Sequence, residues 1–107
     1  MAITSKKVRP VIISPLAQQD IENIISYLSQ NWNQKVVDEF LMKLRLFYAI
    51  ISIHPHLFSY YNKRKNIRKY ALTKQNIVYY RSKKSVVEII TVFDGRQDPR
   101  KFKNLLK

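Results

Sequence analysis

The 107-residue sequence contains no cysteine and a single glycine, Gly95. Without cysteine, the chain has neither disulfide bonds nor a thiolate zinc site. One glycine also excludes a glycine-rich loop of the kind that cradles phosphate groups. The two histidines, His54 and His56, flank Pro55 and form no His/Glu cluster with metal-ligand spacing. The sequence therefore predicts no metal and no cofactor, and we expect a structural role for the histidines at a helix end.

Acidic residues are also scarce. The chain has 7 Asp and Glu against 20 Lys and Arg, which gives a formal net charge of +13. Residues 55–107 alone carry 14 basic and 3 acidic side chains. Such an excess favours an anionic partner. A paired-carboxylate hydrolase is disfavoured because the acids of the first half lie one or two positions apart, so we interpret them as solvated helix surface: Asp20, Glu22, Asp38 and Glu39.

Long hydrophobic runs are absent as well. No run approaches the ~18 residues that a membrane span needs, and the start MAITSKKVRPVII lacks the hydrophobic segment of a signal peptide. Hydrophobic residues nevertheless make up 46% of the chain and aromatic residues 12%, which indicates a folded protein. We therefore expect a single cytoplasmic domain over residues 1–107 with no membrane partner.

Periodicity predicts two helices after a short strand. The β-branched stretch VRPVIIS ends at Ser14 and Pro15, where serine suits an N-cap and proline the first helical position. Apolar residues then recur at helical spacing over residues 17–28. The polar break SQNWNQ follows, with Asn33 as a second N-cap, and helical spacing returns over residues 36–51. The two helices are expected to form an antiparallel hairpin.

The pattern of the remaining chain predicts β-strands. The runs IRKYAL, NIVYYRS and SVVEIITVFD are separated by short polar turns, which is typical of an antiparallel meander. The last run is apolar enough to be the central strand, with Glu88 pointing outward toward a basic residue of a neighbouring strand. The sequence therefore predicts an α+β domain of order β-α-α-β-β-β, with an antiparallel sheet packed against the two-helix hairpin.

Basic side chains are the main candidates for function. The same residue types bind a phosphate backbone and assist its cleavage, so basicity alone does not separate binding from catalysis. Stacking on bases is one use of the aromatic residues that interleave with these cations, but we interpret most of them as core or strand-pair residues. The candidate set for binding a target or nucleic acid is Arg64, Arg68, Lys69, Arg96, Arg100, Lys101 and Phe102.

Three stretches together resemble a known superfamily: ISPLAQQDIENIISYLSQNW, the helix end IHPHLF, and IRKYALTKQNIVYYRSKKSVVEIITVFDGRQDPRKF. They are similar to the RelE/ParE toxins of bacterial type II toxin–antitoxin modules over residues 14–102. The resemblance implies a cognate antitoxin whose extended, often acidic, carboxyl-terminal region wraps the toxin. It also implies one of two targets: RelE-like members cleave mRNA on the ribosome, whereas ParE-like members poison DNA gyrase.

Two positions separate these alternatives. In the RelE-like pattern, Arg96 matches an arginine at the end of the last strand and Lys69 a strand lysine, so a nuclease would use Lys69, Arg81 and Arg96. Asn76, however, stands where an arginine is expected, and Phe102 replaces the catalytic tyrosine. Phenylalanine has no hydroxyl and cannot transfer a proton.

The phrases SPLAQQDIENIISYL, HPHLF and DGRQDPRKF are similar to the ParE and plasmid-stabilisation branch. We therefore expect a non-enzymatic gyrase poison. The alternatives are a ribosome-dependent mRNA endoribonuclease and a nontoxic nucleic-acid-binding module.

Overall fold

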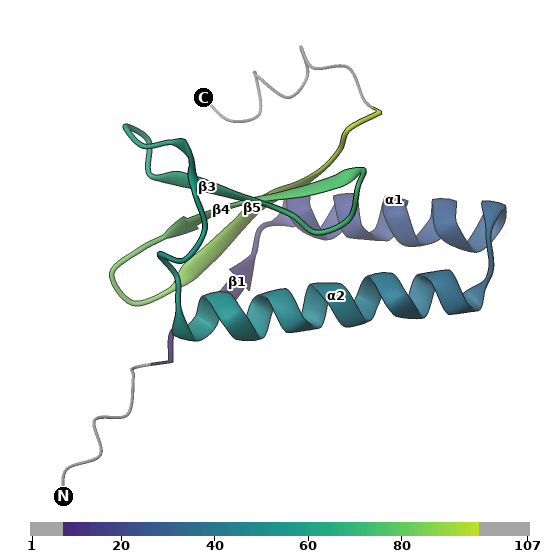
Figure 1. Ribbon diagram of the computed structural model, residues 1–107, viewed down its shortest axis with the longest axis horizontal. Helices are drawn as coiled ribbons and strands as arrows, with labels where there is room; N and C mark the ends of the chain where they lie inside the picture. The colour runs from purple at the N-terminus through teal and green to yellow at the C-terminus, as the bar shows by residue number, and fades with distance from the viewer. Residues whose placement is uncertain (1–7, 97–107) are drawn as a thin grey trace, which may run out of the picture.

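The computed structural model describes residues 8–96, and its elements follow the predicted order with one additional strand (Figure 1). The first half contains β1 (Val11–Ile13), α1 (Pro15–Asn31) and α2 (Gln34–Ile53). The second half contains β2 (Tyr60–Asn62), β3 (Ile67–Ala71), β4 (Asn76–Ser82) and β5 (Val87–Asp94). Strand β2 was not expected because its three residues are too short to display an alternating pattern.

Both helices begin at the predicted caps. The Ser14 hydroxyl accepts a hydrogen bond from the backbone N–H of Ala17 at 3.0 Å, and Pro15 occupies the first helical position. The Asn33 side chain accepts from the N–H of Val36 at 3.1 Å. These contacts satisfy donors that a helix start leaves without partners, which explains why each helix starts where it does.

The five strands form one sheet in the order β1-β5-β4-β3-β2. Strands β3, β4 and β5 pair antiparallel, as predicted, the additional strand β2 pairs antiparallel to β3, and the α+β fold class is confirmed. The sheet is mixed, however, because β1 pairs parallel to β5, with Val11 opposite Val87. Parallel neighbours need a long connection, and the helical hairpin with strands β2 to β4 provides it between β1 and β5. Strand β5 is thus an inner strand but not the central strand that we expected, because β4 occupies the middle.

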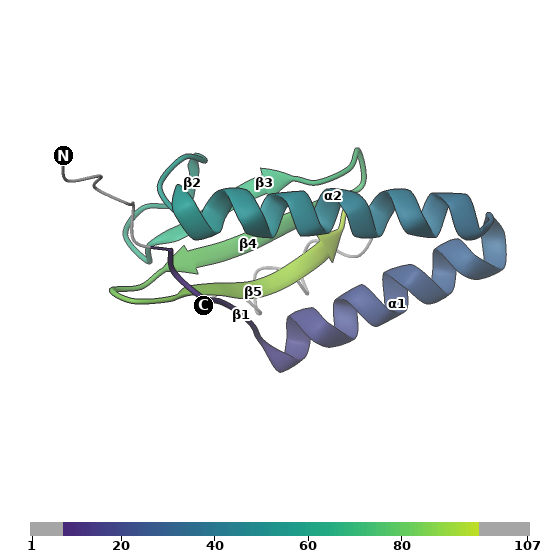
Figure 2. The ribbon, with the colours of Figure 1, turned by 90° about the horizontal axis from the view of Figure 1, so that it is seen from below.

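The two faces of the sheet differ. Figure 2 shows α2 lying across the sheet and α1 running beside β5. On this helix-covered face, Val78 and Tyr80 of β4 belong to the main core cluster together with Phe47 of α2. Successive residues of a strand point to opposite faces, so Tyr79 points away from the helices. It belongs to a separate, smaller cluster on what we call the outer face: Ile67, Tyr79 and Phe93, with Ile77 and Ile90.

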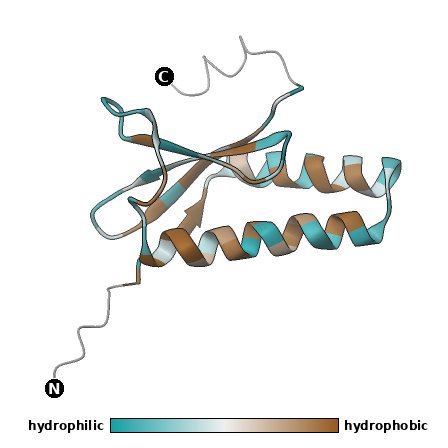
Figure 3. Cartoon of the chain, viewed as in Figure 1, coloured by the Kyte–Doolittle hydropathy of each residue, from teal (hydrophilic) through white to brown (hydrophobic). Residues whose placement is uncertain are grey.

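Figure 3 shows hydrophobic and hydrophilic residues alternating along both helices, as expected for amphipathic helices that cover a core. Several apolar side chains nevertheless remain exposed on the outside of α2 and just beyond its end: Met42, Leu46, Ile50, Ile53 and Leu57. We call this set the α2 stripe. Within residues 8–96, no helix is both long and apolar enough to cross a membrane.

Asp20 corrects one sequence interpretation. We expected it on the solvated surface of α1, but its carboxylate accepts hydrogen bonds from the Thr91 hydroxyl at 2.5 Å and from the backbone N–H of Val92 at 3.0 Å. Strand β1 ends at Ile13, so this part of β5 has no neighbouring strand on that side. Asp20 provides the missing acceptor and fastens α1 to β5, a contact between residues about 70 positions apart that helix periodicity does not reveal.

We expect the Asp20→Ala variant to lower the free energy of unfolding by about 2 kcal/mol, because it removes charge-assisted hydrogen bonds and leaves the buried Thr91 hydroxyl without its acceptor. Urea unfolding followed by circular dichroism measures the change. The matched control is Glu22→Ala on the exposed side of α1, which should change stability by less than about 0.5 kcal/mol. Equal losses in the two variants would show that Asp20 is not a fastening contact.

Candidate functional site

Two of the predicted basic residues share the outer face. Lys69 of β3 lies directly opposite Tyr79 of β4 in the antiparallel register, and Arg81 lies two residues further along β4. Both side chains therefore project on the side of the sheet that the helices do not cover. Glu88 of β5 lies opposite Arg81, and their side chains form an ion pair at 3.6 Å, which confirms the outward orientation predicted for Glu88.

Arg64 belongs to a cluster of exposed cations at the tip of the β2–β3 hairpin, which we call the basic turn: Lys63, Arg64 and Lys65. Hydrogen bonds at both ends fix the turn. The Asn62 side chain accepts from the N–H of Lys65 at 3.1 Å, and the Asn66 side chain donates to the carbonyl of Ser82 at 2.7 Å. Asn66 has a φ of 57°, a left-handed conformation that asparagine tolerates better than most residues. The basic turn is thus anchored to the end of β4.

A tyrosine pair lies between these cations. The rings of Tyr61 and Tyr79 meet edge to face, with centroids 5.1 Å apart. Burial raises the pKa of Tyr79 to about 12, and the neighbouring Tyr61 adds to the rise. The Tyr79 phenol is therefore protonated at neutral pH and cannot serve as a general base there. Most of the interleaved tyrosines are predicted from the sequence to lie in the core or in strand pairs, and the Tyr61–Tyr79 contact is such a pair.

Arg68 has a different environment from its neighbour Lys69. It is buried, and its guanidinium donates hydrogen bonds to the carbonyls of His56 at 3.2 Å and Phe58 at 2.7 Å. The guanidinium carbon also lies 3.9 Å from the centre of the Tyr60 ring, a cation–π contact. These contacts hold the segment between α2 and β2 against the sheet. Arg68 therefore does not join Lys69 and Arg81 on the outer face.

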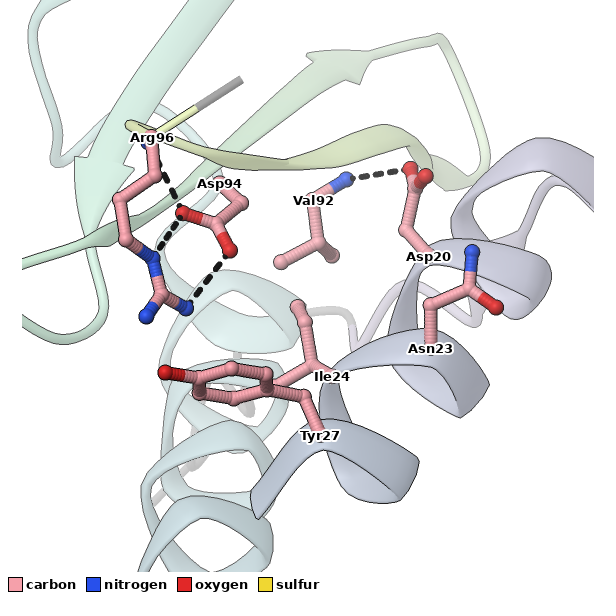
Figure 4. A pocket seen from close by; sticks show the side chains of 7 residues that line it. All are labelled: Asp20, Asn23, Ile24, Tyr27, Val92, Asp94 and Arg96. Atoms are coloured by element: carbon pink, nitrogen blue, oxygen red, sulfur yellow. Dashed lines mark hydrogen bonds and ion pairs between the residues drawn. The ribbon is translucent and has the colours of Figure 1, made fainter. Parts of the chain in front are cut away.

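Arg96 lies against α1, at the end of β5 (Figure 4). Its guanidinium forms two hydrogen bonds with the Asp94 carboxylate, at 3.0 and 2.8 Å, and its backbone N–H donates to the same group at 2.9 Å. The guanidinium carbon sits 4.3 Å from the centre of the Tyr27 ring. These side chains border a hollow of about 380 Å³ between α1 and β5, lined by Asp20, Asn23, Ile24, Tyr27, Val92, Asp94 and Arg96.

The Asp94–Arg96 pair changes the electrostatics of this end of β5. Hydrogen bonds from Arg96 hold the pKa of Asp94 below its ordinary value, against the opposing effect of partial burial. The pair likewise raises the pKa of Arg96 above its ordinary value. Asp94 thus neutralises Arg96 and occupies one of the two edges through which its guanidinium can bind a phosphate group in a bidentate manner.

Of the remaining positions named from the sequence, the structure describes Asn76. Asn76 is buried at the start of β4, where its side-chain carbonyl accepts from the Thr73 hydroxyl at 2.8 Å in the β3–β4 turn. Arg100, Lys101 and Phe102 lie outside the described residues. Among residues 8–96, no three His, Asp or Glu side chains gather closely enough to hold a metal ion.

Comparison with known proteins adds a family and a fold. Residues 11–99 match the family model described as the ParE toxin of the type II toxin–antitoxin system parDE. Among solved structures, a chain from the chromosomal ParDE system of P. aeruginosa superposes with a TM-score of 0.68 at 9% sequence identity. The match covers 82% of this chain and 97% of that chain, so the similarity is one of fold. Comparison with curated protein sequences gives no significant match.

The Asp94–Arg96 contact leads to a pH-dependent prediction. In the wild-type protein, the Asp94 carboxyl should titrate below its ordinary value of 3.8, and Arg96→Gln should raise this pKa because the charge and hydrogen bonds of the guanidinium are lost while partial burial remains. The pair's contribution to stability is therefore present above pH 3.8 and is lost as the pH falls through the lowered value. A carboxyl NMR titration measures the pKa directly.

The matched control for this titration is Lys83→Gln. Lys83 is a cation that pairs with Glu88 instead, at 3.6 Å, so its loss should leave the pKa of Asp94 unchanged. Identical titration of Asp94 in wild-type and Arg96→Gln proteins would contradict the pairing.

Proposed function

We propose that this chain, which belongs to the ParE family of toxins of type II toxin–antitoxin systems, inhibits growth by poisoning DNA gyrase. A cognate antitoxin would neutralise it. One observation favours gyrase over RNA as the target. The cations that an RNA-cleaving site would need close together are separated in this structure. Lys69 and Arg81 project from the outer face, whereas Arg96 lies against Tyr27 of α1.

The chemistry of phosphodiester cleavage makes this separation significant. A nuclease of this type stabilises the charge that develops on the phosphate with cations, and it moves a proton to or from the reacting oxygens. In this chain Asp94 already neutralises Arg96, which reduces the positive charge that Arg96 can offer to a phosphate group. These features favour a toxin that acts by binding an essential complex over an mRNA endoribonuclease.

The surface of α2 supports the antitoxin as a partner. The α2 stripe leaves Met42, Leu46 and Leu57 more than half exposed, at 51%, 57% and 60%. Stripes of this spacing accept an amphipathic segment of another protein. The exposed cations Lys43 and Arg45 lie on the same helix, and the chain carries +13 overall, so an acidic segment is favoured over a second, equally basic copy of the toxin.

Purified toxin incubated with gyrase, ATP and relaxed plasmid should block supercoiling and cause linear, gyrase-cleaved DNA to accumulate. The reason is that a poison traps the enzyme while the DNA is cut. Agarose gel electrophoresis after protease treatment measures both products, and reactions that lack either toxin or gyrase are the controls. Normal supercoiling without cleaved DNA would refute the gyrase target. In-frame cuts in ribosome-bound mRNA that Arg96→Ala abolishes would establish the endoribonuclease alternative instead.

A further inference from the structure

Cations on the outer face are largely without acidic partners. Among residues 8–96, Glu88 is an acid that projects from this face, and it pairs with Arg81 and Lys83, each at 3.6 Å. No salt bridge among residues 8–96 includes Lys69 or any residue of the basic turn. Among the described residues, Lys69 and the basic turn therefore keep their charge available for an anionic ligand.

The backbone that carries these cations is held in position before any ligand arrives. The basic turn is fixed by the hydrogen bonds of Asn62 and Asn66, and the Arg81 side chain donates to the carbonyl of Lys65 at 3.4 Å. Lys69 projects from a strand that pairs with β4 along its length. Binding to a preorganised surface costs less conformational entropy than binding to a mobile one. A surface with this arrangement is suited to follow a chain of phosphate groups.

An aromatic ring adjoins the cations. Tyr61 is 39% exposed, and its ring is held against the buried Tyr79. Where β3 extends past β2, a hollow of about 360 Å³ opens beside Lys69, lined also by Phe58, Ser59, Tyr70, Ala71 and Ile77. The exposed ring could stack on a planar base. The hollow, which is lined mainly by apolar side chains and by Lys69, could accept a base whose phosphate group contacts the lysine. Aromatic rings bind the bases of single strands, whose faces are not already covered by neighbouring bases.

We propose that the outer face of the sheet binds single-stranded nucleic acid. Phosphate groups lie along Lys69 and the basic turn, and a base stacks on Tyr61. This activity goes beyond the gyrase proposal and does not depend on it. DNA and RNA share the phosphate and base chemistry that the face recognises, so the experiment must separate them.

The test is fluorescence anisotropy with the full-length toxin and labelled oligonucleotides of about 12 nucleotides, a length within the range that one such surface covers. Single-stranded DNA, single-stranded RNA and duplex DNA of one sequence are compared at salt concentrations from about 50 to 200 mM. We expect a single strand to bind more tightly than the duplex. Preference for RNA over DNA would indicate that the 2′-hydroxyl is recognised, and equal affinity would indicate that phosphate and base suffice.

Variants separate the two kinds of contact. Tyr61→Ala should weaken single-strand binding about 10-fold, whereas Tyr61→Phe retains the ring and should bind like the wild type. Lys69→Gln should reduce the steepness of the logarithmic salt dependence by about 0.7, the value for one phosphate contact on a single strand. The matched control is Lys43→Gln, which removes an exposed cation from α2 and should leave single-strand binding within about 2-fold of the wild type.

Several outcomes would overturn the proposal. They are equal affinity for single strand and duplex, equal effects of Lys69→Gln and Lys43→Gln, and unchanged binding in Tyr61→Ala. Binding of an acidic peptide in place of any oligonucleotide would assign the face to a protein partner and would also refute it. Thermal unfolding of each variant shows whether it is folded, and the comparison of single strand with duplex on the wild-type protein keeps the proposal falsifiable even if Tyr61→Ala is destabilised.

Discussion

Strand β5 needs hydrogen-bond partners along both edges, and the way it obtains them determines the rest of the structure. One edge pairs with β4, but β1 covers only the first part of the other edge. Ser14 and Asp20 supply the remaining contacts, to the carbonyl of Ile90 at 2.7 Å and to the N–H of Val92 at 3.0 Å. These bonds fix α1 beside the second half of β5. Tyr27, two turns further along α1, is thereby placed under Arg96.

The helix-covered face also explains how the basic residues are distributed. That face is filled by an aromatic core, in which the Phe47 ring stacks on Tyr70 with centroids 5.1 Å apart. A charged side chain entering such a core must find hydrogen-bond acceptors, and Arg68 does so at the carbonyls of His56 and Phe58. Other strand cations project to the outer face, where water or an anionic ligand can compensate their charge. The uneven charge of the sequence thus becomes a difference between two faces of one sheet.

Local features were predictable from the sequence, whereas long-range contacts were not. The caps at Ser14 and Asn33 depend on residues within three positions, and periodicity alone indicated both helices and three strands. The pairing of β1 with β5, the short β2 and the role of Asp20 depend on segments that meet only in the folded chain. A register irregularity between Tyr79 and Tyr80 further prevents simple alternation from assigning every β5 residue to a face.

Three consecutive residues nevertheless determine where the Arg96 side chain lies relative to the other cations. In the sequence Asp94-Gly95-Arg96, the chain turns as β5 ends, with the N–H of Gly95 donating to the carbonyl of Gln75 at 2.6 Å. The turn brings the Arg96 backbone and side chain back onto the Asp94 carboxylate. An arginine at this position of a related nuclease can match in sequence and still differ in chemistry, because a carboxylate two residues earlier changes what the guanidinium can bind. Position in a family pattern therefore does not by itself assign a catalytic role to Arg96.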